Sequence, residues 1–481
     1  MLDQEKIKKN KIIIIKNKKI NIYPSKNFFI TNNIQIIKNN FLNNKKVYLI
    51  GRIINIKNIN KLYFLYIKDF FDNIQLFINL NNNKIKKKTN YLFVNNLLDV
   101  GDIIYICGIL FKTLKNIITV KILNLKILIK CFKVLTFSKI NNKGIVYYKF
   151  TNLEKRYRYR YIDLLINEEI KKKFIIRFNM CKYIRSFLNN KKFIEIETPI
   201  LNTIYGGADA SPFKTYYKYI KKKIYLRIAN EIYLKKMLVG GFNRIYEFSK
   251  NFRNESIDKL HNPEFTMLEL YVTYKNYIWM MNFCKNMLLY ISIKLNNKKY
   301  IVYNKQKIYF DKSFIIKSFY EIINNRLNLK IENLSYKELL NLLKKLNIKI
   351  KKKKKYLIGN LLLKIFEIKC QKYCIQPTII YNYPKDISPL TKSLKKNINL
   401  VQRFELFIAG YEIANAYTEL NDPIEQKKRF FNNKNIDYDF LNSLKIGMPP
   451  STGIGIGIDR LSMLFTNSLN IQDIISFPQM K

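Results

Sequence analysis

Alternating hydrophobic and polar positions dominate the first third of the chain. Between residues 45 and 130 the alternation recurs in five stretches: KVYLIGRIINIKN, KLYFLYIKD, NIQLFINL, GDIIYICGILFKT and NIITVKILNLKILIK. A period of two is typical of strands with one buried face. Gly51, Gly101 and Gly108 fall where bends or bulges are expected. The pattern predicts a small closed barrel such as an OB-fold, with an unspecified β-sandwich as the alternative.

Beyond the barrel the hydrophobic period changes. We expect an N-terminal extension and barrel over residues 1–135, a linker over 136–165 that ends in RYRYRYIDL, and a second domain over 166–481. A helical period begins near Glu168 and passes into the extended stretch FIEIETP, where Pro199 ends the strand. Strands and helices then alternate to the last residue. The segment of about 276–375 is rich in Lys, Asn and Leu and has a helical pattern.

Charge and composition change this picture little. The net charge is +53, from 87 basic and 34 acidic residues. A polyanionic partner would explain it, and so would a compositional drift towards lysine on solvated faces. The run Lys351–Lys355 is interpreted as a solvated loop, and the six cysteines show no metal-binding spacing. No stretch approaches 18 apolar residues, so we expect a cytoplasmic protein without a membrane span.

The single histidine of the chain, His261, lies in a candidate site. NRIYEFSKNFR alternates as a strand, residues 254–262 are polar, and PEFTMLELY alternates again, with Glu269 and Tyr271 on one face. Arg253 therefore ends a strand and faces the loop before an antiparallel return. Its guanidinium fork could clamp a carboxylate and a phosphate, although a structural salt bridge explains it equally well. The acidic face beside a tyrosine suggests a cationic ligand.

A second candidate stretch is STGIGIGIDRLSMLFTNS. Gly453, Gly455 and Gly457 alternate with isoleucines, which argues against a dinucleotide-binding turn. A strand of this pattern is bare on one face, where a flat ring or another backbone can approach closely. Arg460 follows and could reach a phosphate. Tight packing against a neighbouring strand is the alternative.

The third stretch is RFELFIAGYEIANAYTELND, where Gly410 indicates a hairpin. Glu405 and Glu412, on its two strands, could hold Mg²⁺ against phosphates. Glu419, beside a tyrosine and an asparagine, could hold an ammonium group. Strict alternation places Glu412 on the opposite face from Glu419, so the two roles together require a bulge or a twist.

These stretches together resemble class II aminoacyl-tRNA synthetases, and most closely the bacterial-type lysyl-tRNA synthetases. RYRYRYIDL, ETPIL, YGGADASPF, LRIANEIYLKKMLVGGFNRIYEFSKNFRNE, HNPEFTMLELY, NAYTELND and GIGIDRLSMLFTNS follow one another in the family's order. FIEIETP resembles the dimer-forming motif of the class. The likeness covers most of the chain, and it implies an α+β fold: an OB-fold anticodon-binding barrel followed by a catalytic domain with an antiparallel sheet flanked by helices.

The resemblance implies that lysine and ATP form lysyl-adenylate, and that the tRNA(Lys) 3′ end then receives the lysine. Arg253 and Arg460 would be catalytic and bind ATP. The other implied ATP contacts are Glu255, His261, Asn262, Phe265, Glu405 and Glu412. Glu405 and Glu412 would bind Mg²⁺. The implied lysine contacts are Gly207, Glu231, Glu269, Tyr271, Asn415, Tyr417 and Glu419. A homodimer is implied as well.

Two departures bear on the pocket. ANAY stands where the family more often has Gly-Asn-Gly-Phe, so Tyr417 changes the pocket's polarity, and Ser211 stands where the family usually has arginine. The rival interpretations are an aspartyl- or asparaginyl-tRNA synthetase, a lysyl ligase that modifies a protein, and a degenerate tRNA-binding protein. The first needs a cationic pocket and the second lacks a barrel. Arg253, Glu405, Glu412 and Arg460 argue against the third.

Overall fold

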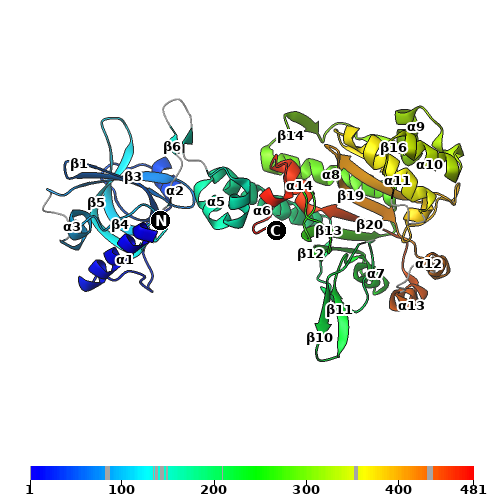
Figure 1. Ribbon diagram of the computed structural model, residues 1–481, viewed down its shortest axis with the longest axis horizontal. Helices are drawn as coiled ribbons and strands as arrows, with labels where there is room; N and C mark the ends of the chain where they lie inside the picture. The colour runs from blue at the N-terminus through cyan, green and yellow to red at the C-terminus, as the bar shows by residue number, and fades with distance from the viewer. Residues whose placement is uncertain are drawn as a thin grey trace. The chain divides into compact units, whose positions relative to one another are not determined.

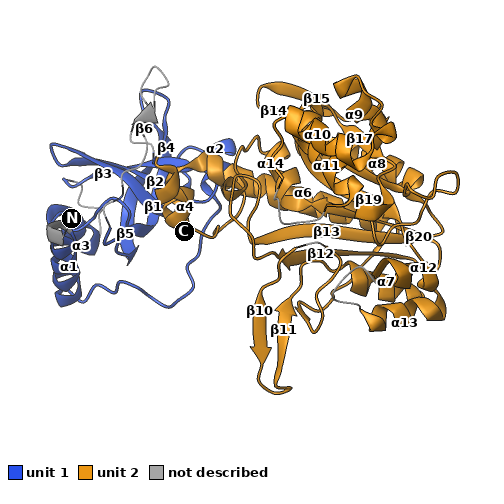
Figure 2. Ribbon diagram, turned by 45° about the vertical axis from the view of Figure 1, so that its right-hand side comes forward, with its two compact units in different colours: residues 1–151 blue, residues 152–481 orange. Residues whose placement is uncertain are grey.

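The computed structural model describes residues 2–81, 87–133, 135, 139–140, 146–147, 150–208, 210–350, 356–430 and 437–480. The run Lys351–Lys355 lies outside them. The chain forms two compact units, Met1–Thr151 and Asn152–Lys481, which Figure 2 shows in different colours.

Unit 1 is built around a closed barrel (Figure 1). Its elements are α1 (Leu2–Asn17), α2 (Ile34–Asn39), β1 (Lys46–Ile59), β2 (Leu62–Lys68), β3 (Asn73–Asn79), α3 (Lys87–Val94), β4 (Ile103–Lys112), β5 (Ile118–Ile129), β6 (Lys139–Ile140) and β7 (Val146–Tyr147). The ring order is β1-β2-β3-β5-β4, in which only the β3–β5 pair is parallel. The predicted five strands and OB-fold are therefore confirmed.

Alternating burial explains the barrel. On β2, Leu65 and Ile67 are fully buried while their neighbours are half-exposed. At Gly108 the β4–β5 register shifts, and a Cβ atom there would lie 2.4 Å from the carbonyl oxygen of Lys121. Tyr63 points into the core, because the strand's alternation places it beside the aliphatic residues, and its hydroxyl donates to the Phe93 carbonyl.

Unit 2 is a mixed domain. Its helices are α4 (Leu153–Arg158), α5 (Arg160–Ile166), α6 (Glu168–Asn190), α7 (Glu231–Val239), α8 (Tyr277–Asn296), α9 (Phe319–Leu327), α10 (Tyr336–Lys345), α11 (Ile358–Lys369), α12 (Pro423–Phe430), α13 (Tyr438–Gly447) and α14 (Ile458–Phe465). Its strands are β8 (Ile194–Glu195), β9 (Leu201–Asn202), β10 (Lys214–Tyr217), β11 (Lys222–Leu226), β12 (Arg244–Phe252), β13 (Glu264–Thr273), β14 (Tyr300–Tyr303), β15 (Gln306–Tyr309), β16 (Ile315–Ser318), β17 (Thr378–Tyr381), β18 (Arg403–Ile408), β19 (Tyr411–Thr418) and β20 (Ser451–Gly457).

Two predicted segments have more structure than the sequence pattern indicated. Helices α4 and α5 lie in the stretch predicted to be a linker, where Arg160 is fully buried and pairs with Asp163 at 2.6 Å. The segment of about 276–375 contains β14, β15 and β16 besides its helices.

An eight-stranded sheet organises unit 2, in the order β16-β17-β18-β19-β20-β13-β12-β8. The pairs are antiparallel except β16–β17 and β12–β8. One face packs against α6 and α8: Met180 and Ile184 of α6 and Met287 of α8 join Ile454 and Ile456 of β20 in one buried cluster. Strand side chains alternate between faces, so the three glycines of β20 belong to the other face.

A bulge in β19 resolves the parity problem of the third stretch. Leu406 pairs with Ala414 and Phe407 pairs with Glu412, so Ile413 is the extra residue. Ile413 is buried in the core, and Glu412 thereby shares the opposite side of the sheet with Asn415 and Tyr417. The hairpin itself turns at Ala409 and Gly410, with φ values of 53° and 79°, as a tight two-residue turn requires.

Candidate active site

A cavity of about 880 Å³ lies on the glycine face of the sheet in unit 2. A volume of this order suits a substrate or cofactor. Strands β13, β19 and β20 form its floor, and the loop 253–263 and residues near Gly207 contribute to its walls. All the predicted site residues line this cavity except Glu405 and Glu419, which are both buried. The three stretches singled out in the sequence therefore meet at one site.

The glycines of β20 make room for the acidic side chains. A Cβ atom at Gly453 would lie 2.3 Å from Tyr271 Cε1 and 2.7 Å from Glu419 Oε1. One at Gly455 would lie 3.0 Å from Met267 Cε, a flexible side chain. The bare face predicted from the alternation is thus occupied by side chains of β13 and by the residue after β19, rather than by another backbone.

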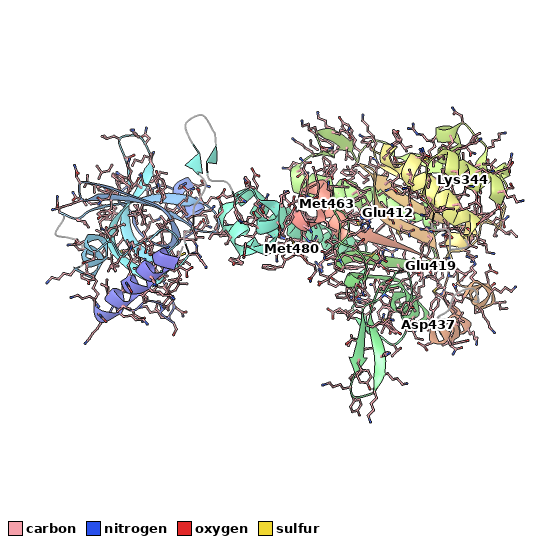
Figure 3. The ribbon with its side chains drawn as sticks, in the orientation of Figure 1. Lys344, Glu412, Glu419, Asp437, Met463 and Met480 are labelled. Carbon is pink, nitrogen blue, oxygen red and sulfur yellow. The ribbon has the colours of Figure 1, made fainter. Side chains whose placement is uncertain are left out.

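Three buried carboxylates gather at one end of the cavity: Glu231 at the start of α7, Glu269 on β13 and Glu419 just after β19. Glu412 and Glu419 lie along the same segment of chain (Figure 3). The Tyr271 hydroxyl donates to Glu269 at 3.0 Å, and the Tyr417 hydroxyl donates to Glu231 at 2.5 Å. Burial raises the pKa of Glu269 to about 8, and it also raises the pKa of Glu419 to about 8. A cationic ligand would relieve this cost.

Lys235 joins two of these carboxylates. Its Nζ lies 2.5 Å from Glu231 Oε1 and 2.6 Å from Glu419 Oε2, and its side chain is fully buried. The contact with Glu419 has the distance of an ion pair, and Glu419 has no further hydrogen-bond partner among the described residues. The carboxylate thus keeps acceptor capacity for a further donor.

Basic and aromatic groups line the other end. The Arg253 guanidinium stands 5.0 Å from the centre of the Phe265 ring, and its buried Nε has no hydrogen-bond partner within the described chain. Arg460 Nη2 lies 3.0 Å from His261 Nε2, and His261 Nδ1 lies 2.8 Å from Asp258. An arginine can only donate, so Nε2 accepts and the Nδ1 proton is donated to Asp258. These two contacts hold the His261 ring in one orientation. Burial of Asp258 opposes ionisation, but the hydrogen bonds from His261 and Leu260 lower its pKa.

Four further residues predicted as contacts also line the cavity. Glu255 is exposed at the cavity edge. Asn262 is buried, and its Nδ2 donates to the Glu264 carbonyl at 2.6 Å. Gly207 has a φ of +84°, and a Cβ atom there would lie 3.1 Å from Ala229. Asn415 lines the cavity, where its Oδ1 accepts from Arg403 Nε at 3.1 Å.

Glu405 and Glu412 offer the hard oxygens that Mg²⁺ prefers. Glu405 accepts from Arg403 at 2.6 Å and from Tyr383 at 2.8 Å, whereas Glu412 faces the cavity 3.4 Å from Arg460 Nη1. Burial raises the pKa of Glu405 to about 7, and the charge of Glu412 adds to that rise. A divalent cation would offset both effects, so the pair fits a metal that takes its remaining ligands from phosphate and water. No cluster of three or more metal-ligating side chains occurs among the residues searched.

Two residues that no sequence pattern singled out are prominent in this geometry. Arg403 lines the cavity and holds Glu405, Asn415 and Ser388 together. Its position two residues before Glu405, on the same strand face, was a usable signal. Lys235 was also missed, although it follows Glu231 by four residues, the helical spacing that brings two side chains together.

Comparison with known proteins places the chain in a class. The model of the class II tRNA synthetases (D, K and N) matches residues 152–481, and the model of the OB-fold nucleic acid binding domain matches residues 47–128. The chain therefore belongs to the class II tRNA synthetases.

Individual relatives are named lysine–tRNA ligases. That of Christiangramia forsetii is 41% identical, over 100% of this chain and 86% of its own. That of Azobacteroides pseudotrichonymphae is 39% identical, over 100% and 99%. That of Buchnera aphidicola subsp. Cinara cedri is 43% identical, over 91% and 87%. Within its class, the chain belongs to the lysine–tRNA ligase family.

Proposed function

We propose that the protein activates L-lysine with ATP and transfers the lysine to the 3′ end of tRNA(Lys). The lysine carboxylate attacks the α-phosphate, pyrophosphate leaves, and the adenylate carbonyl is then attacked by the 3′-terminal ribose, releasing AMP. The observation that carries the lysine assignment is the convergence of Glu231, Glu269 and Glu419 at one end of the cavity. An aspartyl or asparaginyl enzyme would need cationic groups in that place.

In this proposal the acidic end of the cavity binds lysine and the other end binds ATP. The ε-ammonium of lysine contacts Glu419 and Tyr271, with Glu269, Asn415 and Tyr417 around it, and the α-amino group contacts Gly207 and Glu231. Arg253 bridges the lysine carboxylate and the α-phosphate, a role supported by its unpartnered Nε. Catalysis then consists of positioning and of stabilising the charge that develops on phosphate.

ATP occupies the other end. Phe265 stacks on adenine, with Arg460 on the ring's opposite face, and Glu255 holds its exocyclic side. His261 and Asn262 contact the phosphates and their loop. The Arg253 guanidinium lies over the Phe265 ring, so adenine has to share or displace that contact. Glu405 and Glu412 would hold a Mg²⁺ ion, which supplies positive charge to the phosphates.

Selectivity follows from the same carboxylates. A neutral amino acid would leave a buried carboxylate unpaired, at a cost of several kcal/mol by general experience. Large discrimination against neutral side chains is therefore possible without an editing step. Asparagine is excluded for the same reason, and aspartate is excluded because its carboxylate is repelled by those of the pocket.

The remaining parts of the proposal concern the barrel of unit 1, the oligomeric state and the location of the protein. We propose that unit 1 binds the anticodon region of tRNA(Lys), through half-exposed aromatic and basic side chains such as Phe64, Tyr66, Lys68 and Phe77. Two copies form a homodimer. No helix within the searched residues is both long and apolar enough to cross a bilayer, and we expect the protein to act in the cytoplasm, with translation.

The test is ATP–pyrophosphate exchange with each of the twenty amino acids in turn. We expect lysine alone to stimulate exchange. Exchange with aspartate or asparagine would contradict the assignment of the acidic pocket. A folded protein that exchanges with none of them would instead be a tRNA-binding protein without adenylation activity.

A further inference from the structure

Lys235 is a buried cation for which the reaction described above has no role. It stands on the inner face of α7 and is fully buried. Its Nζ contacts Glu231 at 2.5 Å and Glu419 at 2.6 Å. The rings of Tyr417 and Phe440 flank it, with centres at 5.4 and 5.9 Å. A structural ion pair alone would not need to bridge two carboxylates assigned to two different amino groups of the substrate.

We infer that Lys235 is a positioning residue that fixes the charge of the lysine pocket, and so sets its affinity and selectivity for a diammonium substrate. This inference rests on the proposed function. Glu231, Glu269 and Glu419 carry three negative charges when ionised, and Lys235 supplies one positive charge. The two ammonium groups of the substrate supply the other two, while the substrate carboxylate pairs with Arg253. The complex is then neutral within the pocket, which a buried site requires.

The geometry also explains how one cation serves both ends. Lys235 takes one oxygen of Glu231 and one of Glu419, so each carboxylate keeps its second oxygen for a substrate amino group. The Tyr417 hydroxyl shares the Glu231 oxygen with Lys235. Lys235 therefore fixes the positions of the two carboxylates relative to each other, although Glu231 and Glu419 lie on elements that are far apart in the sequence.

Removal of the positive charge of Lys235 is expected to raise the pKa of the carboxyl groups around it. The groups facing it are Glu231 on its own helix, Glu419 and Tyr417 from the β19 segment, and Phe440 from α13. Glu269 and Tyr271 of β13 face the same carboxylates. The charge of Lys235 lowers the pKa of Glu419 against the effect of burial. Without it, the carboxylates retain protons to higher pH, and lysine must displace a more tightly held proton.

The experiment measures the lysine KM and the ATP KM in pyrophosphate exchange from pH 7 to 9, for the full chain and its Lys235→Met variant. At pH 7 we expect the lysine KM of the variant to rise at least tenfold while the ATP KM changes less than threefold. We expect the excess to shrink as pH rises, because the carboxylates then ionise. Lys236→Met is the matched control: Lys236 is adjacent on α7 but pairs with the exposed Asp439, and this variant should behave as wild type.

Two further variants keep the test decisive if Lys235→Met does not fold. Lys235→Arg retains the charge and Lys235→Gln removes it, so the lysine KM should rise more in the glutamine variant, and only there should it depend more steeply on pH. Equal lysine KM values in these two variants, or a joint rise of the lysine and ATP KM without a pH shift, would overturn the inference. An absence of lysine-dependent exchange in the wild type would overturn the proposed function itself, and this inference with it.

Discussion

His261 links Asp258 of the loop to Arg460 in this site. Its ring is fixed between Asp258 and Arg460. We expect His261→Ala to raise the ATP KM about tenfold, because Arg460 and the loop lose their shared anchor at the phosphate end of the cavity. The lysine KM should change less than threefold. Lys259→Ala, in the same loop, serves as the control, and unchanged adenylation kinetics in His261→Ala would refute the role.

Glu269 makes the stability of the ligand-free protein depend on pH. Burial raises its pKa from 4.5 to about 8, so the folded state binds its proton more tightly than the unfolded chain does. This contribution to stability is fully present below pH 4.5 and is lost as pH rises through about 8, at up to about 1.4 kcal/mol per pH unit. The melting temperature should therefore fall between pH 5 and 8.5.

The Glu269→Gln variant tests this dependence. It cannot ionise, so its melting temperature should fall less steeply over the same pH range than that of the wild type. Saturating lysine should offset the fall in the wild type at pH 8.5, because the ammonium group pairs with the ionised carboxylate. Parallel curves for the two ligand-free proteins would show that another group governs the dependence.

At the scale of elements, most of the structure that could be predicted came from the alternation of hydrophobic and polar residues along strands. Alternation located the five barrel strands, β12, β13 and the bare strand β20, since burial on one face leaves a period of two. It failed at Glu412, because the extra residue Ile413 adds one to the count and nothing local in the sequence marks a bulge.

Contacts between side chains that are distant in the sequence could not be predicted, for a different reason. Lys235 contacts Glu419 across 184 positions of chain, and Arg403 contacts Ser388 and Asn415 from a central strand. Such contacts depend on strand order, which periodicity does not determine. The residue roles implied by the family resemblance remain predictions, although the structure brings nearly all of these residues to one cavity.

The lysine pocket is expected to depend on the bare glycine face of β20. In Gly453→Ala the new Cβ atom would lie 2.3 Å from the Tyr271 ring and 2.7 Å from Glu419, so both side chains must move. We expect the lysine KM to rise at least tenfold and the ATP KM much less, measured by pyrophosphate exchange. Gly240→Ala, where the nearest atom is 3.4 Å away in an ordinary contact, is the matched control. Wild-type lysine kinetics in Gly453→Ala would show that the pocket does not depend on the bare strand face.

At the scale of the molecule, unit 2 exposes large apolar side chains on a helix and on two short strands. Phe178 on α6, Ile194 on β8 and Leu201 on β9 are each more than half exposed, at 60%, 53% and 53%. Strand β8 is also the edge of the eight-stranded sheet. Exposed apolar edges are usually covered by a partner, and Ile194 lies within the FIEIETP stretch (residues 193–199) that resembles a dimer-forming motif.

We therefore expect a homodimer in sedimentation velocity at micromolar concentration. The double variant Phe178→Glu and Ile194→Lys should sediment as a monomer, because it buries unpaired charges at the expected interface. Ile424→Lys, a similar change at an exposed position of α12, should leave the dimer intact. Circular dichroism of the double variant separates dissociation from unfolding. If the wild-type protein sediments as a monomer, the expected homodimer is contradicted. The exposed apolar residues would then be left to contact a different partner.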